Sequence, residues 1–386
     1  MQNTEAGETQ VVMDAAADGA KGGLSTIDER LAGLYRRAAG PETAAAVVPV
    51  SRAVLFNLLA YALTDQEAAQ AAKDAAEIVS ARPCRIIILE EAIPSHDQAR
   101  ADVSVICGIT ERGERRLCGE VIRIHTRGDR AVAGSVLPLL IPDVPLVVWV
   151  PGDIPSQDVR FRDLASMASR MIVDSRAFSD LKNGLAQADR FCGSGKPCGA
   201  VQDLSWVSLL PWRELAAQHF DPATTRPYLA RLLDIAVRFA AGEGGPVPPS
   251  PPLLFASWLI DRTQLQVRRI SRSEDGEYRI EAGQEDQPVE ITLIPEQASQ
   301  FAPGRMVAVT IRCKSDNGPA TFRIQGVSDG ELTASEQCEG VCFPPRTLDI
   351  PAAGEARLVS QAVDLPRRDK FYEAALAVAC DLLARQ

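Results

Sequence analysis

Residues 136–153 read VLPLLIPDVPLVVWVPGD, an apolar run that four prolines and an aspartate interrupt. A membrane-spanning helix needs about 20 consecutive, mostly apolar residues that satisfy their own backbone hydrogen bonds. Each proline removes a backbone donor and disturbs helical geometry, so the run does not fit a membrane span. It predicts instead a helix that ends near Ile141, a proline-rich corner, and a buried strand over 145–150, PLVVWV, typical of a parallel sheet.

The length of the chain, 386 residues, exceeds what one ordinary hydrophobic core holds and predicts two domains. The first 24 residues lack a basic start followed by an apolar stretch, as a secretory signal has, so we expect a flexible tail over 1–24 and a cytoplasmic protein. The 41 basic and 51 acidic residues give a net charge of −10. This balance argues against a nucleic-acid partner, and no membrane partner is expected.

The N-terminal half alternates helical and strand patterns. Helices are expected over 25–38, in AVLFNLLAYAL at 53–63, and over 65–81, opened by Thr64 or Asp65. Strands are expected over 84–92, 101–110, 119–128, 145–150 and 169–175, and a helix over about 129–141. Two consecutive strands could form a hairpin around ERGERR, so residues 25–190 are predicted to form a mixed-sheet α/β domain.

The C-terminal half begins with a loop at 191–205, a candidate domain boundary. A helix begins near Pro211, and the strand LLDIAVRFA at 232–240 is expected to place Leu233, Ile235, Val237 and Phe239 on one face. After the loop 242–252 and a further helix, alternating segments from 265 to about 350 predict an antiparallel sheet, closed by a last helix. Residues 191–386 are therefore predicted to form an α+β domain.

Catalytic motifs are weak throughout the chain. The segment GSGKP at 193–197 lacks the spacing of a phosphate-binding loop, and neither H-E-x-x-H nor G-x-S-x-G occurs. The sequence has three histidines that could act as a base near neutral pH, His96, His125 and His219, and this number is small for a chain of its length. We therefore expect no catalytic residues and no cofactor.

Nine cysteines, an odd number spread over the chain, do not resemble a secreted disulfide framework. Most are expected to be reduced, and Cys107 and Cys118, in strand-like segments, to behave as small hydrophobic residues. Four loop cysteines, Cys192, Cys198, Cys338 and Cys342, could form a zinc site or two redox pairs. Their spacings, C-x5-C and C-x3-C, differ from the usual C-x2-C, so no metal is expected, and Cys338 with Cys342 is the better redox candidate.

Six segments taken in order resemble the OpcA family, the glucose-6-phosphate dehydrogenase assembly proteins, over roughly residues 81–262. They read ARPCRIIIL (81–89), LCGEVIRIHTRGDR (117–130), VLPLLIPDVPLVVWVPGD (136–153), SRMIVDSRAF (169–178), DLSWVSLLPWRELAAQHFD (203–221) and LLFASWLIDR (253–262). Ile141 and Val150 depart from the usual residues of the family. The resemblance implies a non-enzymatic activator that binds glucose-6-phosphate dehydrogenase, favours its active oligomer and supports the oxidative pentose phosphate pathway. In cyanobacterial members this partnership is linked to redox control, which adds thioredoxin as a possible partner.

Residues of the matching segments are candidates for the partner surface, because tryptophan and arginine are enriched at interface hot spots. The candidates are Trp149, Pro151, Gly152, Asp153, Trp206, Pro211, Trp212, Arg213 and Glu214. Trp149 fits a core position better, whereas the PGD and PWRE segments fit a surface. Two alternatives stay open, a structural zinc module and a sugar-phosphate-binding enzyme or sensor that uses Arg82, Arg123, Arg127 or Lys196.

Overall fold

The chain forms two compact units that alternate along the sequence. A computed structural model describes residues 10–14, 26–39, 50–91, 100–109, 116–126, 136–192, 198–242, 244–284, 287–328, 330–339, 341–350 and 354–386. Unit 1 comprises Met1–Ala177, Ser194–Gln202 and Gly354–Arg368, and unit 2 comprises Phe178–Gly193, Asp203–Ala353 and Asp369–Gln386. These units are divided at other residues than the domains predicted over 25–190 and 191–386, which stay a prediction.

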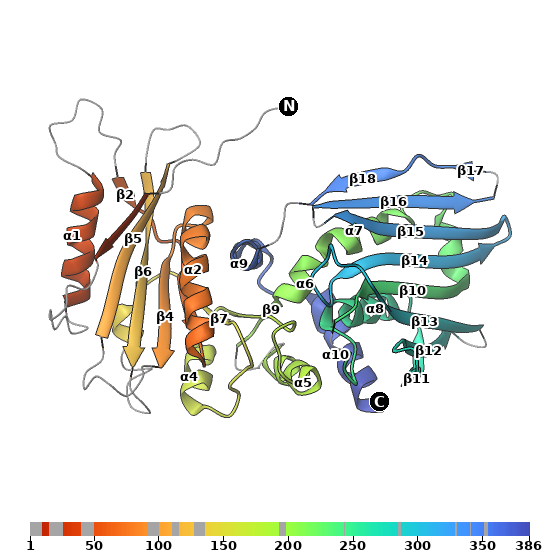
Figure 1. Cartoon of the computed structure of the whole chain (residues 1–386), viewed down its shortest axis with the longest axis horizontal. Helices are drawn as coiled ribbons and strands as arrows, with labels where there is room; N and C mark the ends of the chain where they lie inside the picture. The colour runs from red at the N-terminus through yellow and green to blue at the C-terminus, as the bar shows by residue number, and fades with distance from the viewer. Residues whose placement is uncertain are drawn as a thin grey trace. The chain divides into compact units, whose positions relative to one another are not determined.

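Unit 1 is built on a mixed, mostly parallel sheet in the order β1-β5-β6-β4-β3-β7-β8-β9, with β2 paired to β6 (Figure 1). The strands are β1 (Gln10–Asp14), β2 (Val50–Arg52), β3 (Asn57–Tyr61), β4 (Arg85–Glu91), β5 (Arg100–Ile109), β6 (Arg116–Thr126), β7 (Leu146–Val150), β8 (Arg170–Val173) and β9 (Val201–Asp203). Strands β5 and β6 form the predicted antiparallel hairpin, while β4 pairs in parallel with both β6 and β3. The predicted α/β fold class is confirmed.

Helices cover the sheet of unit 1. They are α1 (Ile27–Ala39), α2 (Asp65–Ala81), the 3-10 turn η3 (Leu137–Leu139), α4 (Val159–Met167) and α9 (Glu355–Asp364). Helix α2 packs against β4, β6 and α9, and it begins with a capping box between Thr64 and Glu67. Of the helix predicted over about 129–141, residues 129–135 lie outside the described residues, and the part that is described forms only η3.

The prediction of a helix at 53–63 is wrong, because Asn57–Tyr61 forms the central strand β3. All five residues are buried between β4 and β7, and a short apolar run does not distinguish a fully buried strand from a buried helix. By contrast, the strand predicted at 145–150 is confirmed as β7.

Unit 2 has a second sheet in the order β11-β12-β13-β10-β14-β15-β16-β17, with β18 paired to β16. Its strands are β10 (Leu232–Ala240), β11 (Gln266–Arg272), β12 (Tyr278–Gln284), β13 (Gln287–Glu296), β14 (Met306–Ser315), β15 (Gly318–Ser328), β16 (Glu331–Cys338), β17 (Val341–Cys342) and β18 (Arg346–Asp349). The sheet is antiparallel as predicted, except that β10 and β13 pair in parallel.

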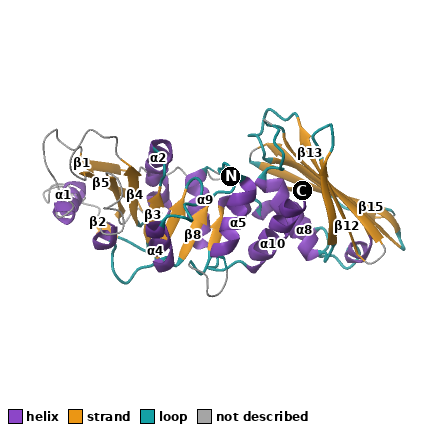
Figure 2. Cartoon of the chain, turned by 90° about the horizontal axis from the view of Figure 1, so that it is seen from below, coloured by secondary structure: helices purple, strands orange, loops and turns teal. Residues whose placement is uncertain are grey.

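The helices of unit 2 are α5 (Leu181–Phe191), α6 (Leu204–Ser208), α7 (Leu210–Gln218), the 3-10 helix η4 (Arg226–Arg231), α8 (Ser250–Arg262) and α10 (Lys370–Arg385). Helices α8 and α10 pack together on one side of the sheet, with α8 in contact with β10 and β13 (Figure 2). None of the helices in the described part of the chain combines the length and apolar character that a bilayer crossing needs.

Of the four residues predicted to share one face of β10, Ile235, Val237 and Phe239 are buried, whereas Leu233 is 42% exposed. The pairing of β10 with β14 shifts register between Leu232 and Asp234. Such an irregularity changes which side chain faces inward, so Leu232 takes the buried position instead.

Candidate functional site

The segment SWVSLLPWRE of unit 2 folds into two short consecutive helices, α6 and α7. Asp203 caps α6, because its Oδ1 accepts a 2.9 Å hydrogen bond from the backbone N–H of Ser205. Pro211 lies in the first turn of α7, where its missing backbone N–H has no intrahelical partner to lose. The helix start predicted near Pro211 is therefore confirmed.

Trp206 is a buried anchor of this segment. Its Nε1 donates a 2.7 Å hydrogen bond to Oδ2 of Asp369, and its ring lies 5.7 Å from that of Tyr372, centroid to centroid. Burial raises the pKa of Tyr372, so its hydroxyl stays protonated and donates to Oδ2 of Asp203. The buried Trp206 therefore connects α6 to the start of α10.

Arg213 stacks on the ring of Trp206. Its guanidinium carbon lies 3.6 Å from the centroid of the Trp206 ring, and Nη2 donates to the backbone oxygen of Trp206 at 3.3 Å. Burial lowers the pKa of Arg213 to about 10, which leaves the side chain cationic at neutral pH. Its charge is thus held in one position by an aromatic ring and a carbonyl.

The start of α7 presents a small mixed surface. Leu210 is 38% exposed, Glu214 is exposed, and Pro211 and Arg213 are half-buried, whereas Trp212 is buried. We define Leu210, Pro211, Arg213 and Glu214 as the α7 surface. It combines apolar area with one charge of each sign.

The PGD turn of unit 1 is mostly buried. Trp149, Pro151 and Gly152 are buried, and of the turn only Asp153 is partly exposed. A Cβ atom on Gly152 would lie 2.2 Å from Oε1 of Glu67, the carboxylate that caps α2. The turn therefore closes on the start of α2. Trp149, Pro151, Gly152 and Asp153 belong to unit 1, whereas Trp206, Pro211, Trp212, Arg213 and Glu214 belong to unit 2.

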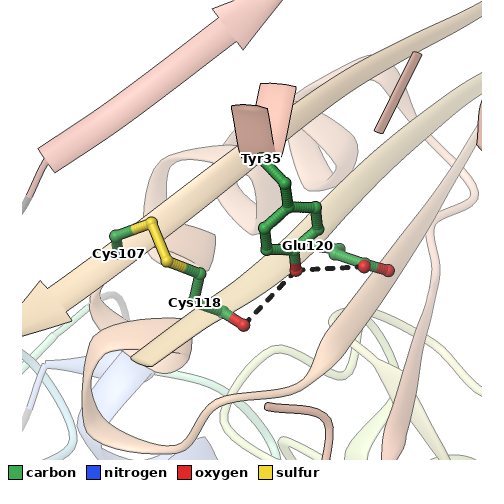
Figure 3. Close-up of a disulfide and its surroundings, with 4 residues drawn as sticks. All are labelled: Tyr35, Cys107, Cys118 and Glu120. Atoms are coloured by element: carbon green, nitrogen blue, oxygen red, sulfur yellow. Dashed lines mark hydrogen bonds between the residues drawn. A yellow bond between two sulfur atoms is a disulfide. The ribbon is translucent and has the colours of Figure 1, made fainter. Parts of the chain in front are cut away.

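Cys107 and Cys118 form a disulfide, so the expectation that they are reduced is wrong (Figure 3). They face each other in the register of β5 and β6, which places both Cβ atoms within bonding reach. The hydroxyl of Tyr35 donates to the backbone oxygen of Cys118 at 3.4 Å. The hairpin predicted around ERGERR is the sequence signal from which this disulfide could have been predicted, because it brings the strands of Cys107 and Cys118 side by side.

Of the four predicted redox cysteines, three have side chains that the structure describes, and none of these three forms a disulfide. Cys192 of unit 2 and Cys198 of unit 1 are buried, and Cys338 is half-buried. Burial raises the pKa of Cys198 to about 11, which disfavours the reactive thiolate. The side chain of Cys342 lies outside the described residues, so its pairing with Cys338 stays a prediction.

Residues considered for the alternative functions are not brought together in the part of the chain that the structure describes. Arg82 pairs with Asp364 at the surface and Arg123 lies in β6, while Arg127, Lys196 and His96 lie outside the described residues. The described residues contain no group of three or more His, Cys, Asp or Glu that could hold a metal ion.

The two remaining histidines each contact one carboxylate. Nε2 of His125 lies 3.0 Å from Oδ2 of Asp102 in unit 1, and Nδ1 of the buried His219 lies 2.7 Å from Oε1 of Glu336 in unit 2. Burial lowers the pKa of His219, so the neutral ring is favoured there.

Two family models match the chain. Residues 75–190 match the model described as the glucose-6-phosphate dehydrogenase subunit N-terminal domain, and residues 199–376 match the corresponding C-terminal domain. Among solved structures, the chain is similar to a dehydrogenase from Clostridium difficile (8% identity, TM-score 0.45, 85% of this chain and 97% of that chain). It is also similar to the transcriptional regulator Gal80p of Kluyveromyces lactis (10% identity, TM-score 0.48, 86% and 91%). Likenesses at this level carry no argument about activity.

Curated relatives share the name OxPP cycle protein OpcA. The protein from Synechococcus elongatus is 29% identical over 315 residues, which cover 78% of this chain and 68% of the relative. The protein from Nostoc punctiforme is 26% identical, and the match covers 79% of this chain and 66% of the relative. The protein from Synechocystis sp. is 28% identical, and the match covers 48% of this chain and 38% of the relative. With both family models matched in order, the chain belongs to the OpcA family, as its quoted segments predicted.

Proposed function

We propose that this protein binds glucose-6-phosphate dehydrogenase and acts as a non-enzymatic activator that favours the active oligomer of that enzyme. The observation that carries the proposal is the match of residues 75–190 and 199–376 to the two domains described for a glucose-6-phosphate dehydrogenase subunit. The shared name of the curated relatives supports a role in the same oxidative pathway.

Such an activator works by binding the active state of the dehydrogenase more tightly than the inactive state. To shift an equilibrium from mostly inactive to mostly active, a difference of roughly 3 to 5 kcal/mol is sufficient. No side chain of the activator needs to touch the substrate. What the activator needs is a surface that is already ordered before the partner arrives, because ordering side chains on binding costs affinity.

The α7 surface meets this requirement and is our candidate contact. Arg213 is held over Trp206, which is itself held by Asp369, so its guanidinium is presented in one position. Leu210 and Pro211 add apolar area, and Glu214 adds a carboxylate that a basic side chain of the partner could pair with. Asp153 is a second candidate, while Trp149, Pro151, Gly152, Trp206 and Trp212 support these positions from within.

The test is a titration of this protein into the dehydrogenase of the same organism, followed by reaction rate and by size-exclusion chromatography. We expect a saturable rise in rate together with co-elution. A parallel titration with reductant and thioredoxin asks whether a disulfide contributes. If the two proteins neither co-elute nor change the rate, the proposal is wrong.

Two charge reversals locate the contact. Glu214→Lys places a like charge opposite a basic partner group and is expected to weaken apparent binding at least about tenfold. Glu77→Lys, at an exposed position on α2, is the matched control and is expected to leave binding unchanged. Equal effects of both variants would remove the α7 surface from the proposal without touching the partnership itself.

A further inference from the structure

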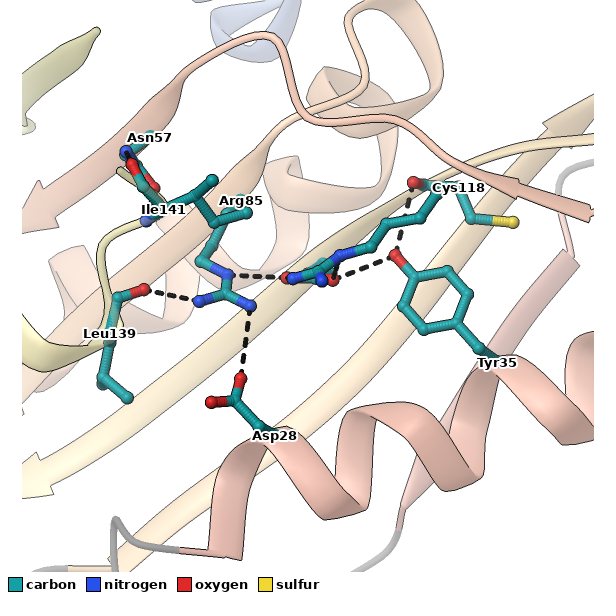
Figure 4. A network of polar contacts seen from close by, with 9 residues as sticks. Asp28, Tyr35, Asn57, Arg85, Cys118, Leu139 and Ile141 are labelled. Carbon is teal, nitrogen blue, oxygen red and sulfur yellow. Dashed lines mark hydrogen bonds and ion pairs between the residues drawn. The ribbon is translucent and has the colours of Figure 1, made fainter. Parts of the chain in front are cut away.

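Unit 1 contains an arginine that is almost fully buried and only partly satisfied. Arg85, 3% exposed at the start of β4, donates from Nε to Oε2 of Glu120 and from Nη1 to the backbone oxygen of Leu139, both at 2.6 Å. Its Nη2 has no hydrogen-bond partner among the described residues. Oδ1 of Asp28 lies 3.7 Å from that nitrogen (Figure 4).

Next to Arg85, two guanidinium groups contact one buried carboxylate. Glu120 is fully buried, and it accepts from Arg85, from Nε of Arg52 at 2.6 Å and from the hydroxyl of Tyr35 at 3.0 Å. One buried carboxylate therefore serves two guanidinium groups. Burial raises the pKa of Tyr35, so this hydroxyl stays neutral and a donor.

Asp28 compensates the remaining positive charge only weakly. Its side chain is 86% exposed on the first turn of α1, and 3.7 Å exceeds the length of a hydrogen bond. An exposed ion pair of this kind contributes little to stability, because water screens it. The position facing Arg85 Nη2 is thus held by a carboxylate that an entering anion could displace.

A pocket of about 430 Å³ opens over these groups. Its polar lining is Asp28, Arg52 and Arg85, and its apolar lining is Val54, Pro138, Leu140, Ile141 and Pro142. Asn57 fixes one wall, because its side chain exchanges two 3.0 Å hydrogen bonds with the backbone N–H and C=O of Ile141. A volume of this size lies in the range of small-molecule sites.

We propose that this pocket binds a small organic anion, with its carboxylate or phosphate group on Arg85 Nη2 and Arg52 and its apolar part against the proline-rich wall. Guanidinium groups match such oxyanions geometrically and stay charged at every physiological pH. Glu120 positions both arginines, and Arg52, 50% exposed, lies where it can turn toward a ligand. The site is separate from the α7 surface and does not depend on the dehydrogenase partnership.

The first test is isothermal titration calorimetry of the full chain with inorganic phosphate and, separately, with acetate. Saturable binding of at least one probe is expected, and the tighter of the two assigns the headgroup. Arg52→Gln removes one donor and is expected to weaken binding about tenfold, while Glu120 keeps its partners Arg85 and Tyr35. Asp28→Asn removes the competing carboxylate and is expected to tighten binding roughly threefold.

Arg82→Gln is the control, since Arg82 is an arginine of unit 1 with comparable exposure whose partner is Asp364. It is expected to leave the affinity for either probe unchanged. The proposal is overturned if neither probe binds saturably at millimolar concentration, or if Arg82→Gln weakens binding as much as Arg52→Gln does. Thermal unfolding of each variant shows whether it is folded.

Discussion

The indole Nε1 of Trp206 donates a 2.7 Å hydrogen bond to the carboxylate of Asp369, although the two residues lie 163 positions apart. The other oxygen of the same carboxylate accepts from the backbone N–H groups of Phe371 and Tyr372 and so caps α10. One side chain therefore joins the start of α10 to α6, and through Trp206 it supports Arg213.

Trp206→Phe tests this connection. The variant keeps an aromatic ring beneath Arg213 but leaves Oδ2 of Asp369 without its indole donor, so the free energy of unfolding should fall by about 1 to 3 kcal/mol. Urea unfolding measures the loss. Trp258→Phe, on α8 of the same unit, is the control and should cost clearly less, since its ring contact with Phe255 survives in a phenylalanine. Equal losses would assign the effect to ring size alone.

Glu120→Gln should destabilise the protein more than any exposed charge change. It leaves buried Arg85 without its countercharge, and breaking a buried ion pair from one side costs about 3 to 5 kcal/mol. Asp364→Asn breaks the exposed pair with Arg82 and should cost less than about 1 kcal/mol. Denaturant unfolding of both variants at one pH compares them, and similar losses would mean that Glu120 is not the buried counterion described.

Local patterns predicted many individual elements, though not the strand β3, and apart from the β5–β6 hairpin they did not predict which strands are neighbours in the sheet of unit 1. Thr64 followed by Glu67 is a capping signal that a reader finds in the sequence, and α2 begins there. Arg85 and Glu120, in contrast, face each other only because β4 and β6 pair in parallel, with β5 placed outside them. Strand order is set by how the helices and strands pack together, so the pocket at Arg85 could not be predicted from spacing.

The disulfide was missed for a related reason. The hairpin of β5 and β6 was expected from its alternating residues, but pairing Cys107 with Cys118 requires the register as well. A shift of one residue would turn one of the two side chains to the other face of the sheet. The family was found because its quoted segments depend on residue identity and order, which the sequence shows directly.

Gly152→Ala should destabilise the N-terminus of α2. The new Cβ would lie 2.2 Å from Oε1 of Glu67 and displace a carboxylate that accepts from the backbone N–H groups of Leu63 and Thr64. Loss of this cap should cost about 1 to 2 kcal/mol in thermal or urea unfolding. Gly33→Ala within α1 is the opposite control. A Cβ there would lie 3.8 Å from Nη2 of Arg36, an ordinary contact, and alanine favours a helix by about 1 kcal/mol. A neutral Gly152→Ala would show that Glu67 moves without loss of its bonds.

Reduction of the Cys107–Cys118 disulfide should lower the free energy of unfolding by about 3 kcal/mol, given the separation of 11 residues between the cysteines. Unfolding with and without reductant measures this difference. In the double variant Cys107→Ser, Cys118→Ser the reductant should have no effect, while the variant itself should resemble the reduced protein. A reductant effect that persists in the double variant would point to other cysteines.

Glu355 should make the protein more stable in mild acid than at alkaline pH. Burial, with the nearby negative charges of Asp174 and Asp74, raises the pKa of Glu355 from 4.5 to about 7. The folded state therefore holds a proton that the unfolded state releases between these values, so this contribution to stability is complete below about pH 4.5 and is lost as pH rises to about 7. Glu355→Gln removes the ionisation and should stabilise the protein at pH 8 by on the order of 2 kcal/mol. Unfolding free energies of both proteins from pH 5 to pH 8 should converge at the acid end, and parallel curves would contradict the raised pKa.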